Sequence, residues 1–375
     1  MPTRMNREEI DRVQLERLNL VLMREKERGG FYKDLPGHVE NLDELHTLPF
    51  TTEDDLRRHG GSMLIVSQSG IDKIISGETS GTTGDGKRLF YTAADCENTV
   101  LLFMDGISEM TGPGDKVLVC MPYGGPNSLG SLISEAIVRL GAEPIEAGTG
   151  KTYLQLIDIV KEQKPESFIG FPQTLLAVLR IAGRMSIHKA LISGDVCAPE
   201  VAEGIERILN PENAEPGKKQ LSLFPHYGSR EMCLGGAVTC SAHCGMHLRE
   251  GHVIAEIVDE DGNVLPDGEF GELVITTVGM EAQPLIRYRT GDRTRIIPGL
   301  CTCGRETLRL DSVTRLEGDL TALDDMVFRN PDVVDYRVWF QTDDERKGGP
   351  RIEVLLRKDV SEMDRPFYPA KRHYL

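Results

Sequence analysis

The sequence lacks the long apolar runs and the dense cysteine pattern that mark membrane and secreted proteins. No stretch approaches the roughly 20 apolar residues of a membrane-spanning helix, and the first residues are charged, unlike the apolar centre of a signal peptide. Eight cysteines in 375 residues are too few for a disulfide scaffold, which favours reduced thiols in a cytoplasmic protein. A single tryptophan beside 39 glycines favours an α/β protein with many turns over a helical bundle.

Positive charge is also scarce. The 59 acidic and 43 basic residues give a formal net charge of −16, which disfavours nucleic acid or an anionic membrane surface as a partner. An anionic ligand would therefore need a local positive site. The length suits two domains, or one large domain with an appendage.

One glycine-rich stretch has the composition of a phosphate-binding loop: Thr79-Ser80-Gly81-Thr82-Thr83-Gly84-Asp85-Gly86-Lys87. Its glycines let backbone N–H groups approach an anion, its hydroxyls can donate to phosphate oxygens, and Lys87 adds a positive charge. It is not a Walker A loop, because Arg88 stands where that motif has Ser or Thr. A polar surface linker is the alternative. Apolar residues 73–75 and 89–91 predict strands on both sides of the loop.

The middle of the chain alternates between short apolar runs and helical patterns. Strands are expected at residues 116–121, 143–145, 167–170 and 190–193, with helices at 92–107, 131–140, 154–162 and 174–182. This order predicts a parallel sheet of the doubly wound kind, whose ligands bind beyond the carboxyl ends of the strands. Segments 122–126, 170–172 and 193–195 are candidate walls of such a site, or ordinary turns.

After residue 250 the pattern changes to strands at 253–258 and 271–278 with a hairpin turn at Asp261-Gly262. We expect a large domain at residues 1–316, with a β-rich part from about 220 to 316. A reduced C-terminal domain would follow at 317–375, with strands at 336–341 and 351–357.

Two further segments complete a recognisable set with the glycine loop: Tyr227-Gly228-Ser229-Arg230-Glu231 and Tyr288-Arg289-Thr290-Gly291-Asp292. With these, residues 10–316 resemble the acyl-adenylate-forming (AMP-binding) enzymes, in particular the phenylacetate–CoA ligase branch. The resemblance implies the adenylate-forming α/β fold. It also implies activation of a carboxylic acid by ATP and Mg²⁺ as an acyl-adenylate, followed by transfer to coenzyme A.

The resemblance assigns roles to individual residues. The loop residues Thr79, Ser80, Gly81, Thr82, Thr83 and Gly84 would bind the ATP phosphates together with Lys87. Tyr227 would stack on adenine beside Gly228 and Ser229, Glu231 would hold Mg²⁺, and Asp292 would accept the ribose hydroxyls. Arg315 would lie on the ribose side, and Asp195 in the nucleotide site. Tyr123, Gly124, Gly125, Phe171 and Pro172 would line the acid pocket, which suits an apolar acid, including an aryl acid.

The sequence departs from the family at three places. Gly86 stands where proline is common, Arg230 replaces a hydroxyl residue, and no clean Gly-Arg-x-Asp-Asp hinge follows Arg315. In this sequence, only Lys371 corresponds to the catalytic lysine of the family. Two alternatives therefore stay open, an adenylating enzyme with an acceptor other than CoA and a nucleotide-binding regulatory protein without turnover. The sequence leaves the oligomeric state open, a homodimer included.

Cysteine and histidine cluster in the β-rich part. Cys240, His243, Cys244 and His247 lie close together, and Cys301 and Cys303 follow. Four such ligands suit tetrahedral Zn²⁺, and buried thiolates need a partner. Because the resembled branch often carries a cysteine, a histidine and a later Cys-x-Cys-Gly-Arg, we expect structural zinc on Cys240, His247, Cys301 and Cys303, with Cys244 or His243 as substitutes. Reduced free cysteines are the alternative.

Overall fold

The computed structural model describes residues 5–76, 87–210, 222–316, 320–339 and 351–362. The chain forms two compact units: unit 1 comprises Met1–Leu102 and His226–Leu316, and unit 2 comprises Phe103–Pro225 and Glu317–Leu375. Within the described ranges, no helix is both long enough and apolar enough to cross a membrane.

Unit 2 is built on the predicted parallel sheet. Its strands, in spatial order, are β6 (Lys189–Ile192), β5 (Ser167–Gly170), β3 (Lys116–Cys120) and β4 (Glu143–Glu146). The first three residues of β7 (Leu223–Tyr227) pair in parallel with β6. Strand β5 is buried along its whole length, as expected for a strand covered on both faces.

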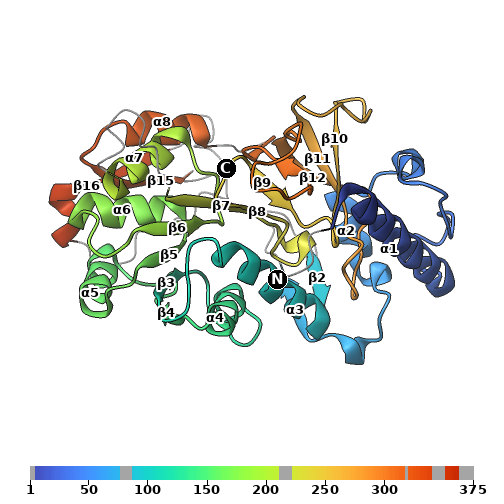
Figure 1. Cartoon of the computed structure of the whole chain (residues 1–375), viewed down its shortest axis with the longest axis horizontal. Coiled ribbons are helices and arrows are strands. Elements are labelled where there is room, and N and C mark those ends of the chain that lie inside the picture. Colours follow the sequence, from blue (N-terminus) through green and yellow to red (C-terminus); the bar gives the residue numbers. More distant parts are fainter. Residues whose placement is uncertain (1–4, 77–86, 211–221, 317–319, 340–350, 363–375) are drawn as a thin grey trace. The chain divides into compact units, whose positions relative to one another are not determined.

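Four helices connect these strands (Figure 1). They are α4 (Leu129–Arg139), α5 (Tyr153–Gln163), α6 (Pro172–Ala182) and α7 (Pro199–Leu209). Helix α5 starts at a capping box of Thr152 and Gln155, whereas α6 and α7 start with proline, whose missing N–H removes no helical hydrogen bond there. Helix α6 therefore begins within the predicted wall segment 170–172, whereas α4 and α7 begin a few residues after the segments 122–126 and 193–195.

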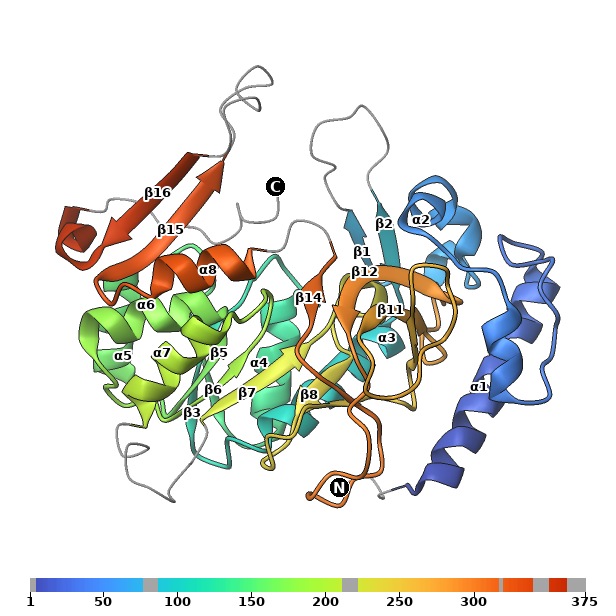
Figure 2. The ribbon, with the colours of Figure 1, turned by 90° about the horizontal axis from the view of Figure 1, so that it is seen from above.

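The C-terminal part of unit 2 packs on these helices. It comprises α8 (Thr321–Phe328), β15 (Val333–Trp339) and β16 (Arg351–Leu356), and the two strands form an antiparallel pair. Figure 2 shows this hairpin and α8 beside α6 and α7, and Phe328 and Tyr336 belong to the same buried cluster as Leu175. The sequence predicted both strands of this hairpin, although the expected start of the first strand at residue 336 lies three residues after the observed start at Val333. It did not predict α8.

Arg180 and Tyr153 anchor this C-terminal part through polar contacts. The buried Arg180 guanidinium donates to the carbonyl oxygens of Phe328 and Val333, each at 2.5 Å, and of Asn330 at 3.1 Å. The Tyr153 hydroxyl donates to the buried carboxylate of Asp335. Because these acceptors come from the end of α8, from the turn that follows it and from β15, the segment is an integral layer of unit 2.

Unit 1 combines helices with two antiparallel sheets and a hairpin. One sheet has the order β10 (Ile254–Val258), β11 (Gly271–Thr276), β12 (Tyr288–Thr294) and β14 (Thr314–Arg315). The other joins the last two residues of β7 to β8 (Ala237–Thr239), β9 (Met246–Leu248) and β13 (Arg309–Leu310). The helices are α1 (Arg7–Arg28), α2 (Glu53–His59) and most of α3 (Ala93–Ile107).

Helix boundaries in unit 1 follow from local chemistry. Asn6 and Glu9 form a capping box at the start of α1, and Gly29 ends it with φ of 68°. Thr52 and Asp55 form the same kind of box at α2. Strands β1 (Lys73–Ser76) and β2 (Arg88–Tyr91) pair antiparallel, which confirms the two strands predicted beside the glycine loop. The loop itself lies outside the described residues.

Candidate functional site

Tyr227 and Asp292 of unit 1, predicted to contact the nucleoside, are hydrogen-bonded to each other. The Tyr227 hydroxyl donates to Asp292 Oδ2 at 2.6 Å. Asp292 lies opposite Arg315 in the register of β12 and β14, so Arg315 Nη1 reaches Asp292 Oδ1 at 3.0 Å. Burial raises the pKa of Asp292, while Arg315 and Tyr227 oppose that shift. Tyr227 and Arg315 thus each hold one oxygen of the Asp292 carboxylate and fix its orientation.

Glu231, the predicted Mg²⁺ ligand, is buried and neighbours Lys87. Lys87 Nζ lies 2.5 Å from Glu231 Oε1 and 3.5 Å from Glu53 Oε1. The Tyr288 hydroxyl also donates to Glu231 Oε1, at 3.3 Å. Burial acts to raise the pKa of Glu231, but the charge and hydrogen bond of Lys87 outweigh it and hold the pKa below its usual value. Glu231 is therefore an ionised carboxylate.

The tight backbone turn that carries Glu231 requires glycine at position 228. A Cβ atom on Gly228 would lie 2.5 Å from the carbonyl oxygen of Leu234, so only glycine fits. Cys233 and Leu234 then have φ of 53° and 68°, the left-handed conformation that side chains disfavour. The Tyr91 hydroxyl donates to the carbonyl oxygen of Arg230 at 2.6 Å and holds this tight turn. The Arg230 side chain is exposed and forms no ion pair with any described residue.

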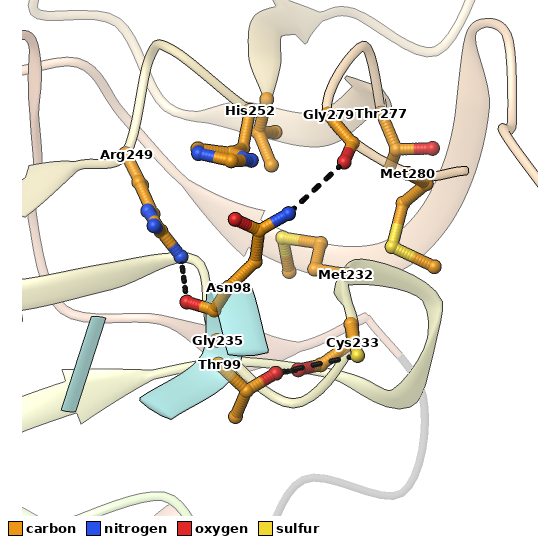
Figure 3. Close-up of a pocket in the computed structure, with 11 residues that line it drawn as sticks. Asn98, Thr99, Met232, Cys233, Gly235, Arg249, His252, Thr277, Gly279 and Met280 are labelled. Atoms are coloured by element: carbon orange, nitrogen blue, oxygen red, sulfur yellow. Dashed lines mark hydrogen bonds between the residues drawn. The ribbon is translucent and has the colours of Figure 1, made fainter. Parts of the chain in front are cut away.

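A small hollow lies behind this turn, lined by Asn98 and Thr99 of α3, Met232, Cys233, Arg249, His252 and Gly279, among others (Figure 3). Asn98 bridges the hollow. Its side-chain amide donates to the carbonyl oxygen of Gly279 at 3.4 Å, and its backbone carbonyl oxygen accepts from the Arg249 guanidinium. Thr99 Oγ1 donates to the carbonyl oxygen of Cys233 at 2.5 Å. Burial lowers the pKa of His252 to about 3, so the ring is neutral. These contacts support the turn that carries Glu231.

Asp95 is a buried organiser of unit 1 that the sequence did not reveal. Its carboxylate accepts hydrogen bonds from the backbone N–H groups of Thr92, Glu281 and Ala282 at 2.7 to 3.1 Å. It therefore caps α3 and also fixes a segment 186 residues away. The cap could have been recognised from the Thr-x-x-Asp spacing, whereas the distant contacts have no local signal.

The predicted acid-pocket residues lie in unit 2, at the carboxyl ends of parallel strands. The Tyr123 hydroxyl hydrogen-bonds Ser134 Oγ at 2.7 Å, and burial raises the pKa of Tyr123 to about 12. Gly125 has φ of 97°, which glycine tolerates. Phe171 packs against Gly194, where an added Cβ would lie 2.6 Å from its ring, and Pro172 begins α6.

A second hollow opens beside Phe171, also within unit 2. Its lining residues are Cys120, Gly148, Thr149, Lys151, Tyr153, Leu156, Phe171 and Thr174. Of the predicted acid-pocket residues, Phe171 alone is in this lining, although the Tyr123 ring lies 3.8 Å from the position of a Cβ on Gly148. Asp195, predicted for the nucleotide, also belongs to unit 2 and accepts from the N–H of Val196 at 2.8 Å.

Cys240, His247, Cys301 and Cys303 of unit 1 come together as predicted. Their candidate ligand atoms all lie within 4.8 Å of one another. The Sγ atoms of Cys240 and Cys301 are 3.8 Å apart, and Cys303 Sγ is 3.4 Å from His247 Nε2. His247 Nδ1 hydrogen-bonds Thr307 Oγ1 at 2.7 Å, which directs Nε2 toward the thiols.

The two substitute ligands are outside this group. Cys244 is exposed and its Sγ donates to the carbonyl oxygen of Ala242. His243 is not among the four grouped residues either. Among the described residues, the cluster thus contains the four ligands that were expected first and neither substitute, and zinc binding itself stays a prediction.

Two sets of predicted residues fall outside the part of the chain that the structure describes. They are Lys371 and the loop residues Thr79, Ser80, Gly81, Thr82, Thr83 and Gly84. Their assignment to phosphate binding and to catalysis stays a prediction.

Comparison with known proteins gives a family match over more than half of the chain. Residues 79–281 match the model of the AMP-binding enzyme family. Over 351 residues the chain is 28% identical to the phenylacetate-coenzyme A ligase of Aromatoleum evansii, which covers 87% of this chain and 77% of that protein. The phenylacetate-coenzyme A ligase of Thermus thermophilus is 27% identical over 398 residues, which cover 96% of this chain and 83% of that protein.

Solved structures agree in fold. A 2-hydroxyisobutyryl-CoA ligase in the postadenylation state superposes with a TM-score of 0.73 at 19% identity, covering 91% of this chain and 77% of that one. The same ligase in the thioesterification state gives a TM-score of 0.70 at 20% identity, and the match covers 94% of this chain and 79% of that one. The expected adenylate-forming fold is confirmed.

Proposed function

Because the chain belongs to the AMP-binding enzyme family, we propose that it is an AMP-forming acid–CoA ligase that activates a carboxylic acid with ATP. The observation that carries this proposal is the set of groups held together in unit 1, in which Lys87 pairs with Glu231 and Arg315 and Tyr227 fix Asp292. The similarity to phenylacetate–CoA ligases over most of the chain supports the choice of reaction.

The proposed reaction has two balanced steps. A carboxylate oxygen of the acid attacks the α-phosphorus of ATP, the bond to the bridging oxygen breaks, and pyrophosphate leaves. The CoA thiolate then attacks the acyl carbon, and AMP leaves with the electrons of the broken C–O bond. Neither step needs a nucleophilic side chain, so the protein contributes mainly positioning and charge neutralisation.

Asp292 is assigned to the ribose. Its carboxylate is buried, directed by Arg315 and Tyr227, and ionised carboxylates accept readily from two neighbouring hydroxyls. The Tyr227 ring, at the end of β7, is assigned to adenine stacking. The left-handed Gly291, with φ of 70°, gives the backbone beside Asp292 a conformation that a residue with a side chain would resist.

Glu231 is assigned to Mg²⁺, since an ionised carboxylate oxygen is the kind of ligand this cation takes. The bound cation would neutralise charge on the phosphates. In the structure the ammonium of Lys87 balances Glu231 at 2.5 Å. When ATP and the metal bind, we infer that Lys87 exchanges Glu231 for a phosphate oxygen, so that each anion keeps a cation.

Structural Zn²⁺ on Cys240, His247, Cys301 and Cys303 is part of the proposal. Tetrahedral coordination with Zn–S bonds of about 2.3 Å requires sulfur atoms about 3.8 Å apart. The distance between the Cys240 and Cys301 sulfurs is 3.8 Å, and Thr307 orients the imidazole of His247. With four protein ligands the ion would have no open position, so it would stabilise the β8–β9 and β13 region and leave catalysis to other residues.

Two rival functions have specific support. Arg230 and the missing hinge motif favour a nucleotide-binding protein without turnover, and the same C-terminal departure favours an adenylating enzyme with another acceptor. Acid-dependent exchange of labelled pyrophosphate into ATP separates the enzymes from the binding protein. CoA-dependent release of AMP then separates the two enzymes, and adenylation without CoA stimulation would reject the ligase.

We also propose a cytoplasmic location, in line with eight cysteines that are all unpaired by disulfides in the structure. A homodimer is the oligomeric state we propose to test, by light scattering at several protein concentrations.

A further inference from the structure

Tyr288 is the first residue of β12, and its side chain is directed at Glu231 within unit 1. Only 3% of the residue is exposed, and its hydroxyl donates to Glu231 Oε1 at 3.3 Å. Because an ionised carboxylate only accepts, the direction of this hydrogen bond is fixed. Among the described residues, no other group forms a hydrogen bond with this hydroxyl. The hydroxyl therefore acts on the residue that is proposed to hold Mg²⁺.

The backbone of Tyr288 is held on both sides. On one side it pairs with Ile275 of β11. On the other side it forms a parallel bridge with Thr51, which is itself buried. The Thr51 N–H donates to the carbonyl oxygen of Arg287, and the Thr51 carbonyl oxygen accepts from the N–H of Arg289, each at 2.9 Å. A tyrosine ring has only two side-chain torsions, so this fixed backbone leaves the hydroxyl little freedom.

Lys87 contacts the same carboxylate oxygen but is held less firmly. Its Nζ lies 2.5 Å from Glu231 Oε1 and 3.5 Å from Glu53 Oε1. Lysine carries its charge on a flexible four-carbon stem, and Lys87 directly follows the glycine loop. Each oxygen of an ionised carboxylate has about two lone-pair sites, and the ammonium and the tyrosine hydroxyl take up those of Oε1. Lys87 is therefore the donor that can leave, and Tyr288 is the donor that stays.

We propose that Tyr288 is a positioning residue for Mg²⁺ binding, because its hydroxyl keeps Glu231 Oε1 in place when the Lys87 ammonium leaves that oxygen. This inference rests on the proposed function, in which Glu231 holds Mg²⁺ and Lys87 moves to a phosphate oxygen. Carboxylates that bind metals are themselves oriented by hydrogen bonds, and removal of such a partner typically costs about 10- to 100-fold in metal affinity or activity. Tyr288 acts through Glu231 and is assigned no contact with ATP or the acid.

The test is Tyr288→Phe, which removes the hydroxyl and keeps the buried ring. In acid-dependent pyrophosphate exchange, the variant should need about tenfold more Mg²⁺ or above for half-maximal rate. Because the hydroxyl serves only the metal ligand, kcat at saturating Mg²⁺ and the KM for the acid should each change by less than about twofold. Binding of Mn²⁺ to the protein with ATP, measured from the electron paramagnetic resonance signal of the free ion, should weaken by the same factor as the Mg²⁺ requirement. This second readout needs no turnover.

A double-mutant cycle and a matched tyrosine variant separate positioning from a general effect on the fold. In the Glu231→Gln background, Tyr288→Phe should change Mn²⁺ binding by less than about twofold, because the group it acts on is gone. Tyr32→Phe is the control. The buried Tyr32 hydroxyl hydrogen-bonds Thr51 Oγ1 at 2.9 Å and accepts from the N–H of Ile286 at 3.1 Å, so it supports the same region without a bond to Glu231. This variant should keep the wild-type Mg²⁺ dependence, and thermal melting of every variant checks folding.

The outcomes distinguish this inference from the proposed function. Equal Mg²⁺ dependence and equal Mn²⁺ affinity in the wild type and Tyr288→Phe would overturn the positioning role and leave acid activation standing. An equal loss in Tyr32→Phe, or an undiminished loss in the Glu231→Gln background, would assign the effect to the fold and would also overturn it. Absence of exchange with every acid in the wild type would reject the proposed function, while Mn²⁺ binding with ATP would still decide whether Tyr288 acts on Glu231. A wild type that binds no Mn²⁺ with ATP would reject both.

Discussion

Replacing Glu25 by glutamine is expected to change how the stability of the protein responds to pH. Glu25 lies on the buried face of α1, fully shielded from solvent, and neither of its carboxylate oxygens has a hydrogen-bond partner among the described residues. Burial raises its pKa from 4.5 to about 8, and the charge of Arg24 only partly opposes this shift. The folded protein therefore keeps this proton at pH values where the unfolded chain has lost it.

The sign of the effect follows from proton uptake. Between about pH 4.5 and 8 the folded state binds one more proton at Glu25 than the unfolded state does, so the free energy of unfolding falls as pH rises. The slope is about 1.4 kcal/mol per pH unit, and the whole interval gives up to about 5 kcal/mol. Water entering around the ionised carboxylate would reduce this figure. Glutamine removes the titration while keeping the shape.

The assay is urea unfolding of the wild type and Glu25→Gln at pH 5, 6, 7 and 8. The absolute effect at one pH mixes titration with the burial of an unpartnered amide, so the informative quantity is the difference between the two proteins as a function of pH. We expect this difference to shift in favour of Glu25→Gln as pH rises. Glu27→Gln, on the exposed face of the same helix, serves as the control. Parallel curves for wild type and Glu25→Gln would refute a buried, protonated carboxyl.

Four further predictions concern the site and the fold. Asp292→Asn should raise the KM for ATP about tenfold or more in the exchange assay, because a charge-assisted contact to the ribose is lost and Arg315 loses its partner. Glu231→Gln should raise the Mg²⁺ concentration needed for half-maximal exchange, and an unchanged Mg²⁺ dependence would exclude Glu231 as a ligand. Arg180→Met should lower the free energy of unfolding by about 3 kcal/mol or more, measured in urea, since three carbonyl acceptors lose their donor. Protein purified without added metal should contain one zinc per chain by elemental analysis, and Cys301→Ser should lose it; a metal-free wild type would reject the zinc site.

The sequence could reveal those parts of the site whose conformation depends on neighbouring residues. Strand ends followed by glycine and the Thr-Gly-Asp segment carry their geometry within a few residues, whereas the polar loop between β1 and β2 lies outside the described residues. Asp292 lies opposite Arg315 through the register of β12 and β14, and resemblance to a known motif order predicted that both contact the nucleotide. The choice of cysteine ligands needed more, because the β8, β9 and β13 pairings decide which thiols meet.

Contacts between distant segments had no such signal. Asp95 reads as an ordinary helix cap, and nothing near it in sequence indicates that Glu281 and Ala282 donate to the same carboxylate. Lys151 reads as a solvated lysine in a glycine-rich turn, and only the convergence of three strand ends shows that it shares a lining with Phe171 and Thr174. Side-chain packing of this kind depends on the whole sheet, so local patterns cannot supply it.

The C-terminal departure matters for mechanism because of where the segment packs. Phe328, Val334 and Tyr336 are buried with Leu175 and Leu179 of α6 in one apolar cluster. Arg180 of the same helix donates to three carbonyl oxygens, at the end of α8, in the turn after it and at the start of β15. Moving the segment as a separate body would expose these side chains and leave the Arg180 charge without its acceptors, at a cost of several kcal/mol. Any motion between adenylation and thioester formation is therefore expected to keep α8 and the β15–β16 hairpin packed on α6 within unit 2. A variant with cysteines joining α6 to β15 should then retain CoA-dependent AMP release when oxidised, whereas loss of that step alone would demonstrate an independently moving C-terminal segment.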